Sequence, residues 1–265
     1  MKLMPVTAFL IVIFLGSFHN FSFAVEEQNA WQQMKGQDLV IYYRATVPED
    51  FVQTTMDTSE EEIRRVTDNF GITKPPAWSG DRRIKIYIYN DRDDYVKNGG
   101  QAAWSHGVAF SLARTIKTWP SANGFFDTIL PHELGHIIFR NYIGFKADLP
   151  LWFEEGVAIY QEKAKRLGAE AVVKEALQKD KFIPLSQLTG MRLYKNSNNE
   201  VVDLFYAESA SAFHYLITEY GEQEFYMLCE DIKAGIPFEE ALHKVYLKFR
   251  TVSDLSLYWQ QYLQG

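Results

Sequence analysis

The stretch PHELGH, residues 131–136, makes the most specific chemical statement in this chain. His132 and His136 are four residues apart, so on a helix their imidazoles project from the same face, one turn apart. Two imidazoles in this arrangement can bind one metal ion, and Glu133 between them can hold a water molecule and accept its proton. We therefore predict a metal-binding helix with His132 and His136 as ligands and Glu133 as general base.

A third ligand is needed, because a catalytic zinc ion takes three protein ligands and leaves one position open for water. Gly144 and Pro150 break the first helix, and a second helix is predicted over residues 152–165, beginning WFEEGVA. A helix that returns beside the first could supply a carboxylate from Glu154 or Glu155. Adjacent helix positions point about 100° apart, so only one of the two can face the metal.

The segments HELGH and WFEEGVA together resemble the gluzincin metallopeptidases, in which a glutamate of a W-x-x-E-G-x-A segment completes the zinc site. The resemblance implies Glu155, directly before Gly156, as the third ligand of one zinc ion, and leaves Glu154 facing solvent or supporting a ligand. From about Asp38 to the C-terminus the chain also resembles small bacterial secreted proteins described as peptidase MA-like. The implied fold is α+β and zincin-like, with an N-terminal mixed β-sheet lobe and a C-terminal helical lobe.

The resemblance also implies a hydrogen-bond donor for the oxyanion, because family members commonly use a Tyr or His of the helical lobe for this purpose. Tyr206 is our prediction, since it opens a helix and follows Glu155 at a comparable distance. His214, two turns further on, is the alternative donor, and a packing role remains open for both residues. His106 and His243 have no partner at ligand spacing, and we expect both to be structural or exposed.

The aminopeptidase branch has a G-x-M-x-N segment near a glutamate that binds the free amine of the substrate. Here the corresponding residues 107–111 are GVAFS, without an acidic side chain. We therefore expect a peptidase that acts on peptide or protein substrates, and an endopeptidase rather than an aminopeptidase. Two alternatives are a catalytically inactive zinc-binding scaffold, which the intact Glu133 disfavours, and a zinc hydrolase of a non-peptide amide or ester.

The N-terminus predicts export. Met1 and Lys2 precede an apolar run over residues 6–16, and small residues at Ser22 and Ala24 offer a cleavage site. This arrangement is typical of a signal peptide, here residues 1–24, and implies a secreted or periplasmic protein. The run is short for a bilayer span, so no stable membrane insertion is expected after cleavage.

Composition restricts the remaining possibilities. The formal net charge is −7 and the pI is about 5.4, which disfavours a nucleic-acid partner. The single Cys229 cannot form an internal disulfide and lies in an apolar pattern, so we expect it to be buried.

The order of predicted elements divides the chain into a β-sheet lobe over residues 25–145, which ends in the metal helix, and a helical lobe over residues 146–265. Strands are predicted at residues 38–45, 83–89 and 107–118. A helix is predicted within residues 48–70, with Ser59 and Glu62 as a capping box. We place an edge strand beside the metal within residues 107–118, although an inner strand is the alternative there.

Overall fold

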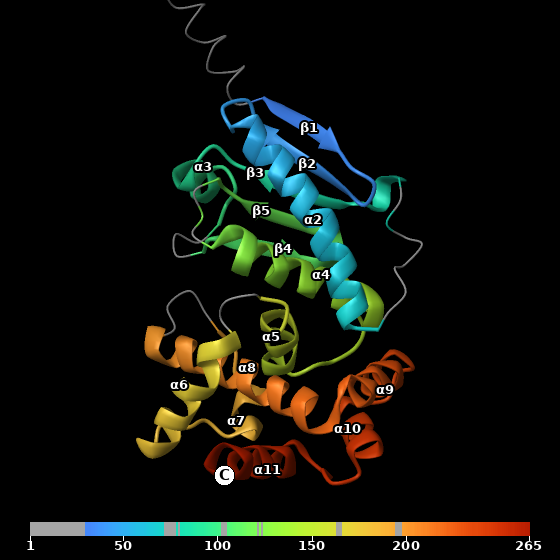
Figure 1. The fold of residues 1–265 in the computed structure, drawn as a ribbon, viewed down its shortest axis with the longest axis vertical. Helices are drawn as coiled ribbons and strands as arrows, with labels where there is room; N and C mark the ends of the chain where they lie inside the picture. The colour runs from blue at the N-terminus through green and yellow to red at the C-terminus, as the bar shows by residue number, and fades with distance from the viewer. Residues whose placement is uncertain are drawn as a thin grey trace, which may run out of the picture.

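The computed structural model describes residues 30–71, 78, 80–101, 105–120, 122, 124–162, 166–193 and 198–265. Its first half contains a five-stranded sheet with strand order β1-β2-β3-β5-β4 (Figure 1). The two outer strands run antiparallel to their neighbours, while β2, β3 and β5 are parallel, so the sheet is mixed as predicted. The strands are β1 (Trp31–Lys35), β2 (Leu39–Arg44), β3 (Ile84–Ile88), β4 (Gly107–Phe110) and β5 (Thr115–Thr118).

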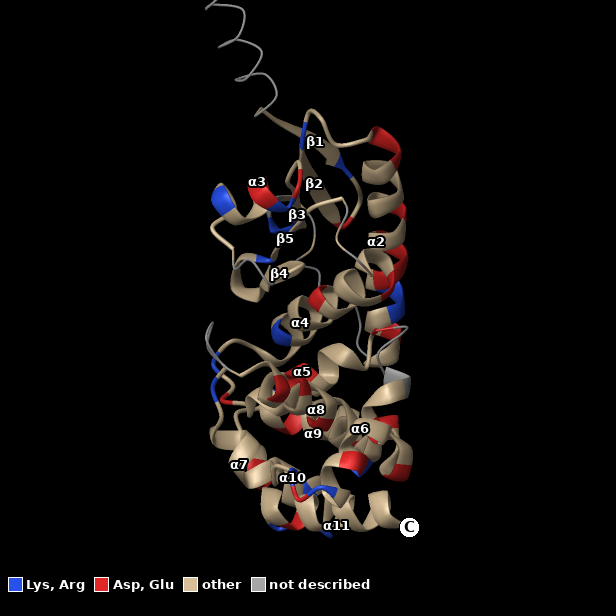
Figure 2. Cartoon of the chain, turned by 90° about the vertical axis from the view of Figure 1, so that its left-hand side faces the viewer, with Lys and Arg blue, Asp and Glu red and all other residues tan. Residues whose placement is uncertain are grey.

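One face of the sheet is buried against helix α2 (Glu49–Asn69). Along β3, the isoleucines 84, 86 and 88 are fully buried, whereas Lys85 and Tyr87 between them are half-buried. This period of two is what a strand with one covered face requires. Figure 2 shows α2 running along one side of the sheet, with the short helix α3 (Arg92–Lys97) on the other.

The predicted cap at Ser59 is wrong, because α2 continues through this position and buries Ser59 completely. The helix instead begins after Pro48, with Glu49 and Asp50 in its first turn. Proline before the first turn and acidic residues within it are ordinary signals for a helix start. The helix therefore starts at Glu49, ten positions before the predicted cap at Ser59.

Residues 107–118 form two strands, β4 and β5, joined by the 3-10 turn η3 (Ser111–Ala113) and by Arg114 in a left-handed conformation, φ 49°. Within the described sheet β4 is an edge strand and β5 is internal, so the edge strand lies in the predicted interval. Helix α4 (Leu130–Ile143), which follows the π-helical turn η4 (Phe125–Ile129), packs beside β4.

The chain after α4 is helical, as predicted. Helix α5 (Leu151–Ile159) stops six residues earlier than expected, and Glu162 lies in the segment that follows it. Cys229 is a buried thiol. The other helices of this part are α6 (Arg166–Gln178), α7 (Leu185–Gly190), α8 (Asn199–Tyr220), α9 (Glu222–Lys233), α10 (Phe238–Tyr246) and α11 (Val252–Gln264).

Two glycines allow α4, α5 and α8 to approach closely. A Cβ atom on Gly156 would lie 2.6 Å from the carbonyl oxygen of Ser209 and 2.7 Å from the Cβ of Phe213, both on α8. A Cβ atom on Gly135 would lie 3.3 Å from the Cα of Ala158 on α5. These contacts explain why glycine occupies one position in each of the segments HELGH and WFEEGVA, where a side chain would separate the helices.

The predicted signal peptide, residues 1–24, lies outside the described residues, and the division of the chain at residue 145 stays a prediction. No described helix combines the length and the apolarity that crossing a bilayer requires.

Candidate metal centre

Three predicted ligand atoms meet where α4 and α5 cross. The Nε2 atoms of His132 and His136 are 3.1 Å apart. The Oε2 atom of Glu155 lies 3.4 Å from the first and 3.5 Å from the second. The three side chains are largely buried, and their ligand atoms form a triangle that could hold one metal ion.

This triangle fits zinc. With bonds of 2.0–2.1 Å, the ligand atoms of a tetrahedral zinc ion are separated by about 3.3–3.4 Å. The Oε2 atom of Glu155 is also buried without a hydrogen-bond partner among the described residues. A buried carboxylate oxygen without a partner is costly, and a cation would remove that cost. Two imidazoles and one carboxylate favour zinc over calcium or magnesium.

Glu154 is directed away from the triangle and pairs with Arg140 at the end of α4. Its Oε2 atom accepts a hydrogen bond of 2.6 Å from Arg140 Nε, and its Oε1 atom is paired with Nη2 of the same guanidinium. Arg140 also donates to the carbonyl oxygen of Ala147. The expectation that Glu154 faces solvent or supports a metal ligand is therefore wrong. Its role is to fasten the α4–α5 connection, and this leaves Glu155 to face the histidines.

Glu162 is a site residue that the sequence analysis missed. Its Oε1 atom lies 2.8 Å from Nδ1 of His132, and its side chain is 2% exposed. A carboxylate on Nδ1 keeps the Nε2 lone pair directed at the metal and makes the imidazole a stronger ligand. Glu162 comes seven residues after Glu155. On the predicted helix over residues 152–165 this spacing places both glutamates on one face, so the spacing is a signal that could have identified Glu162.

The segment that carries Glu162 is held by α2. The Nη2 atom of Arg65 donates to the carbonyl oxygen of Gln161 at 2.6 Å, and Nδ2 of Asn69 donates to the Gln161 side chain at 3.0 Å. Arg65 is itself paired with the buried Glu62 at 2.6 Å. Helix α2 therefore supports His132 on α4, through the residue next to Glu162.

Glu133 lies beside the triangle and next to the edge strand. Burial raises the pKa of the Glu133 carboxyl above its ordinary value, against the attraction of the two neighbouring histidines. The backbone of Ala109 on β4 offsets part of this rise. A carboxylate whose pKa is raised is suited to taking and returning a proton.

The histidines and glutamates of the triangle shift one another's pKa values. Burial opposes protonation of His132, but its interactions with Glu155 and Glu162 outweigh burial and raise its pKa to about 10. For Glu155 burial acts in the opposite sense, and the positive charges of His136 and His132 outweigh it, so its pKa is well below the usual range.

Tyr206 lies within α8, seven residues after the helix begins, so the expectation that it opens a helix is wrong. Burial raises the pKa of its hydroxyl, and the negative charges of Glu155, Glu133 and Glu162 raise it further. Tyr206 is therefore electrostatically coupled to the metal site and protonated at neutral pH.

The other histidines have different surroundings. His214 interacts with Thr218 on the same helix, with 3.3 Å between Nε2 and Oγ1. His106 stacks on Trp119, and Nδ1 of His243 lies 3.0 Å from the carbonyl oxygen of Phe249.

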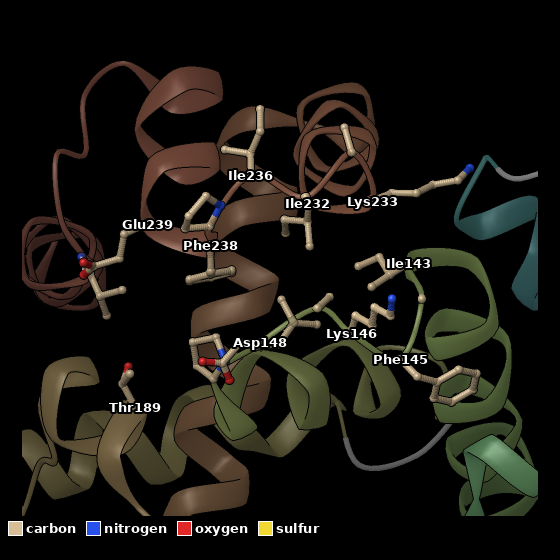
Figure 3. A pocket seen from close by; sticks show the side chains of 18 of the residues that line it. Ile143, Phe145, Lys146, Asp148, Thr189, Ile232, Lys233, Ile236, Phe238 and Glu239 are labelled. Carbon is tan, nitrogen blue, oxygen red and sulfur yellow. Dashed lines mark hydrogen bonds between the residues drawn. The ribbon is translucent and has the colours of Figure 1, made fainter.

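A separate groove of about 1130 Å³ lies between the α4–α5 connection and the α9–α10 turn (Figure 3). Apolar side chains such as Ile143, Ile232 and Phe238 line it together with the charged Lys146 and Asp148. None of the three ligand residues lines this groove.

The α+β fold and the site together define a zincin-type centre: a mixed sheet, an H-E-x-x-H helix next to its edge strand, and a carboxylate from the following helix. A family profile described as Peptidase MA superfamily matches residues 71–265, and the chain belongs to that superfamily. No curated protein matches the chain.

Among solved structures the chain is similar to native yeast LTA4 hydrolase, with a TM-score of 0.49 and 14% sequence identity. The match covers 84% of this chain and 37% of that one, so the chain spans little more than a third of the hydrolase.

Proposed function

We propose that this protein is a zinc-dependent metallopeptidase that hydrolyses peptide bonds inside polypeptide chains. The observation that carries the proposal is the triangle of His132, His136 and Glu155, whose edges of 3.1, 3.4 and 3.5 Å match those of a tetrahedral zinc site. A zinc ion held there would polarise the scissile carbonyl and lower the pKa of a water molecule to about 7.

The residues of the chain divide the remaining work. Glu133 takes the proton of the attacking water and returns it to the leaving amine. Glu162 fixes the ring of His132 through Nδ1. The hydroxyl of Tyr206, kept protonated by its raised pKa, donates a hydrogen bond to the developing oxyanion.

The edge strand supports action on internal bonds. An extended substrate can lie along β4 and use main-chain hydrogen bonds to bring its scissile carbonyl to the metal. Strand β4 and the residue after it, Ser111, offer no carboxylate to bind a free amino group. We infer further that the protein works after export, secreted or in a periplasm, because residues 1–24 have the pattern of a signal peptide.

The test compares the purified protein with its Glu133→Gln variant, using metal analysis and a set of quenched fluorescent peptides. The parent should contain one zinc ion per chain and cleave blocked peptides, and a chelator should stop cleavage. Glu133→Gln should keep the zinc and lose about a thousandfold or more in rate, because the general base is gone. Hydrolysis that survives in this variant would refute the mechanism. Cleavage of blocked esters or non-peptide amides, with peptides left intact, would refute the substrate class.

A further inference from the structure

The sheet separates charge between its two faces. None of the five strands contains an Asp or Glu, and their basic residues are Lys35, Arg44, Lys85 and Lys117. The register pairs Lys35 with Val40, Val40 with Lys85, and Tyr87 with Lys117. Because side chains alternate along a strand and paired positions share a face, all four cations project from the face opposite α2. The chain as a whole has a net charge of −7, so this face differs in sign from the molecule's overall charge.

Aromatic side chains lie between these cations. Tyr42 and Tyr87, a registered pair on neighbouring strands, have ring centroids 4.8 Å apart and planes inclined by 11°. Coplanar rings could not come so close, so the two rings overlap and present their edges to solvent. Trp31 packs edge to face against Tyr87, and its ring lies 4.0 Å from the guanidinium of Arg44. Trp31 nevertheless remains 38% exposed, which leaves an accessible indole surface at the edge of the sheet.

Figure 2 shows that this side of the sheet is less covered than the side against α2, with α3 toward one end. There Asp94 of α3 forms an ion pair with Arg44, at 3.4 Å. We name the remaining part the open sheet face and define it by Trp31, Lys35, Tyr42, Lys85, Tyr87 and Lys117.

We propose that the open sheet face binds an acidic segment of the polypeptide substrate, away from the bond that is cut. Lysine ammonium groups and tyrosine hydroxyl groups are donors for carboxylates, and Trp31 offers an apolar surface for an aromatic or aliphatic neighbour. The face continues to β4, the edge strand beside the metal helix, so one chain could engage both regions. The choice of a polypeptide rests on the proposed peptidase function.

The geometry disfavours a nucleic acid as the occupant. Proteins that bind single strands on a sheet expose aromatic ring faces for base stacking, whereas Tyr42 and Tyr87 cover one another. The charge is also modest, because Arg44 is paired and Lys117 Nζ donates to the carbonyl oxygen of Gly99 at 3.0 Å. A phosphate backbone needs many more cations.

The experiment measures binding without cleavage, in the full-length zinc-loaded Glu133→Gln variant. The probes are fluorescent dodecapeptides, one rich in Glu and Tyr and one in which Lys replaces each Glu, followed by fluorescence anisotropy. The double substitution Lys35→Glu with Lys85→Glu should weaken binding of the acidic peptide by at least about tenfold. The control is Lys179→Glu with Lys181→Glu, which changes the same charge on exposed lysines near the end of α6. A milder pair, Lys35→Gln with Lys85→Gln, and Trp31→Ala should also weaken binding if the charge reversals impair folding.

The proposal is overturned if the acidic peptide binds all variants equally, or if the control pair weakens binding as much as the sheet pair. If an oligonucleotide or heparin binds the same face more tightly than the acidic peptide, an acidic polypeptide is not the ligand of this face and the proposal is refuted. Because the assay needs no hydrolysis, an inactive parent enzyme would refute the proposed function and leave this binding result interpretable.

Discussion

The Nδ1 atom of His132 lies 2.8 Å from a carboxylate oxygen of Glu162, a residue that itself makes no contribution to the ligand triangle. The contact fixes the imidazole in the orientation that directs Nε2 at Nε2 of His136 and Oε2 of Glu155. Glu162 is in turn placed by its neighbour Gln161, which α2 holds through Arg65 and Asn69. The metal site therefore depends on elements from both halves of the chain.

Substitution of Glu162 should weaken zinc binding without removing it. We expect Glu162→Ala to reduce affinity by about 10–100-fold, because the ring of His132 loses its orienting acceptor. Glu162→Gln should lose less, since its amide oxygen can still accept from Nδ1. Competition with a chromophoric chelator measures both, and Glu175→Ala on the exposed face of α6 is the control. Equal affinities for all four proteins would show that the contact does not orient the ligand.

Substitution of Glu155 should remove zinc, whereas substitution of its neighbour Glu154 should reduce stability. Glu155→Gln should lose zinc, because one corner of the triangle disappears. Glu154→Gln should keep zinc and lower the free energy of unfolding by about 1–3 kcal/mol, since Arg140 loses a charged partner. Metal content and chemical unfolding of the two variants distinguish these outcomes. The assignment is reversed if Glu154→Gln is the variant that loses the ion.

Gly156 should not tolerate a methyl group. Gly156→Ala would place Cβ 2.6 Å from a backbone oxygen of α8, and we expect a loss of about 1–3 kcal/mol from this overpacking. Gly168→Ala on α6 is the matched control, because no atom lies within 4 Å of its added Cβ. That variant should be neutral or gain about 0.5–1 kcal/mol, as alanine is the better helix former. Thermal unfolding of both apo-proteins checks the difference.

Glu208 should make stability fall as the pH rises from about 4.5 to about 8. It is fully buried, accepts a hydrogen bond from the Ile183 N–H at 2.8 Å, and burial raises its pKa to about 8. The folded state favours the protonated carboxyl, so its contribution is complete below about pH 4.5 and is lost as the pH rises through about 8. Glu208→Gln stays neutral throughout. Relative to the parent, it should gain on the order of 2–4 kcal/mol between pH 5 and pH 8.

Urea unfolding of both proteins at the two pH values measures this change. Parallel pH profiles for the parent and Glu208→Gln would contradict it, because another group would then be responsible for the pH dependence.

The sequence predicted those parts of the site that rest on local spacing. His132 and His136 are one turn apart on any helix. Helix geometry allows only one of Glu154 and Glu155 to face them, and the resemblance to the gluzincin segment, in which the ligand directly precedes the glycine, implied Glu155. The sheet and the helical second half followed from periods of two and of about 3.6. In each case the information lies within a few consecutive residues.

What the sequence did not predict depends on contacts between distant residues. Arg65 and Gln161 are 96 positions apart, and nothing local indicates that they meet. The same reason explains why Glu154 was not expected to pair with Arg140. Ser59 was misassigned because a capping box has the same letters whether it begins a helix or lies buried within one, and only packing distinguishes the two.

The arrangement of charge around the sheet has a consequence for how the molecule meets other molecules. The outward side of α2 carries exposed acidic residues at 49, 50, 57, 61 and 68, while the strands behind it direct every cation the other way. Such a layout separates the charges of α2 from those of the strands, and a field between them acts before any surfaces touch. A negatively charged neighbour would turn the molecule as it approaches, and salt at about 0.1 M would restrict that effect to separations below about a nanometre.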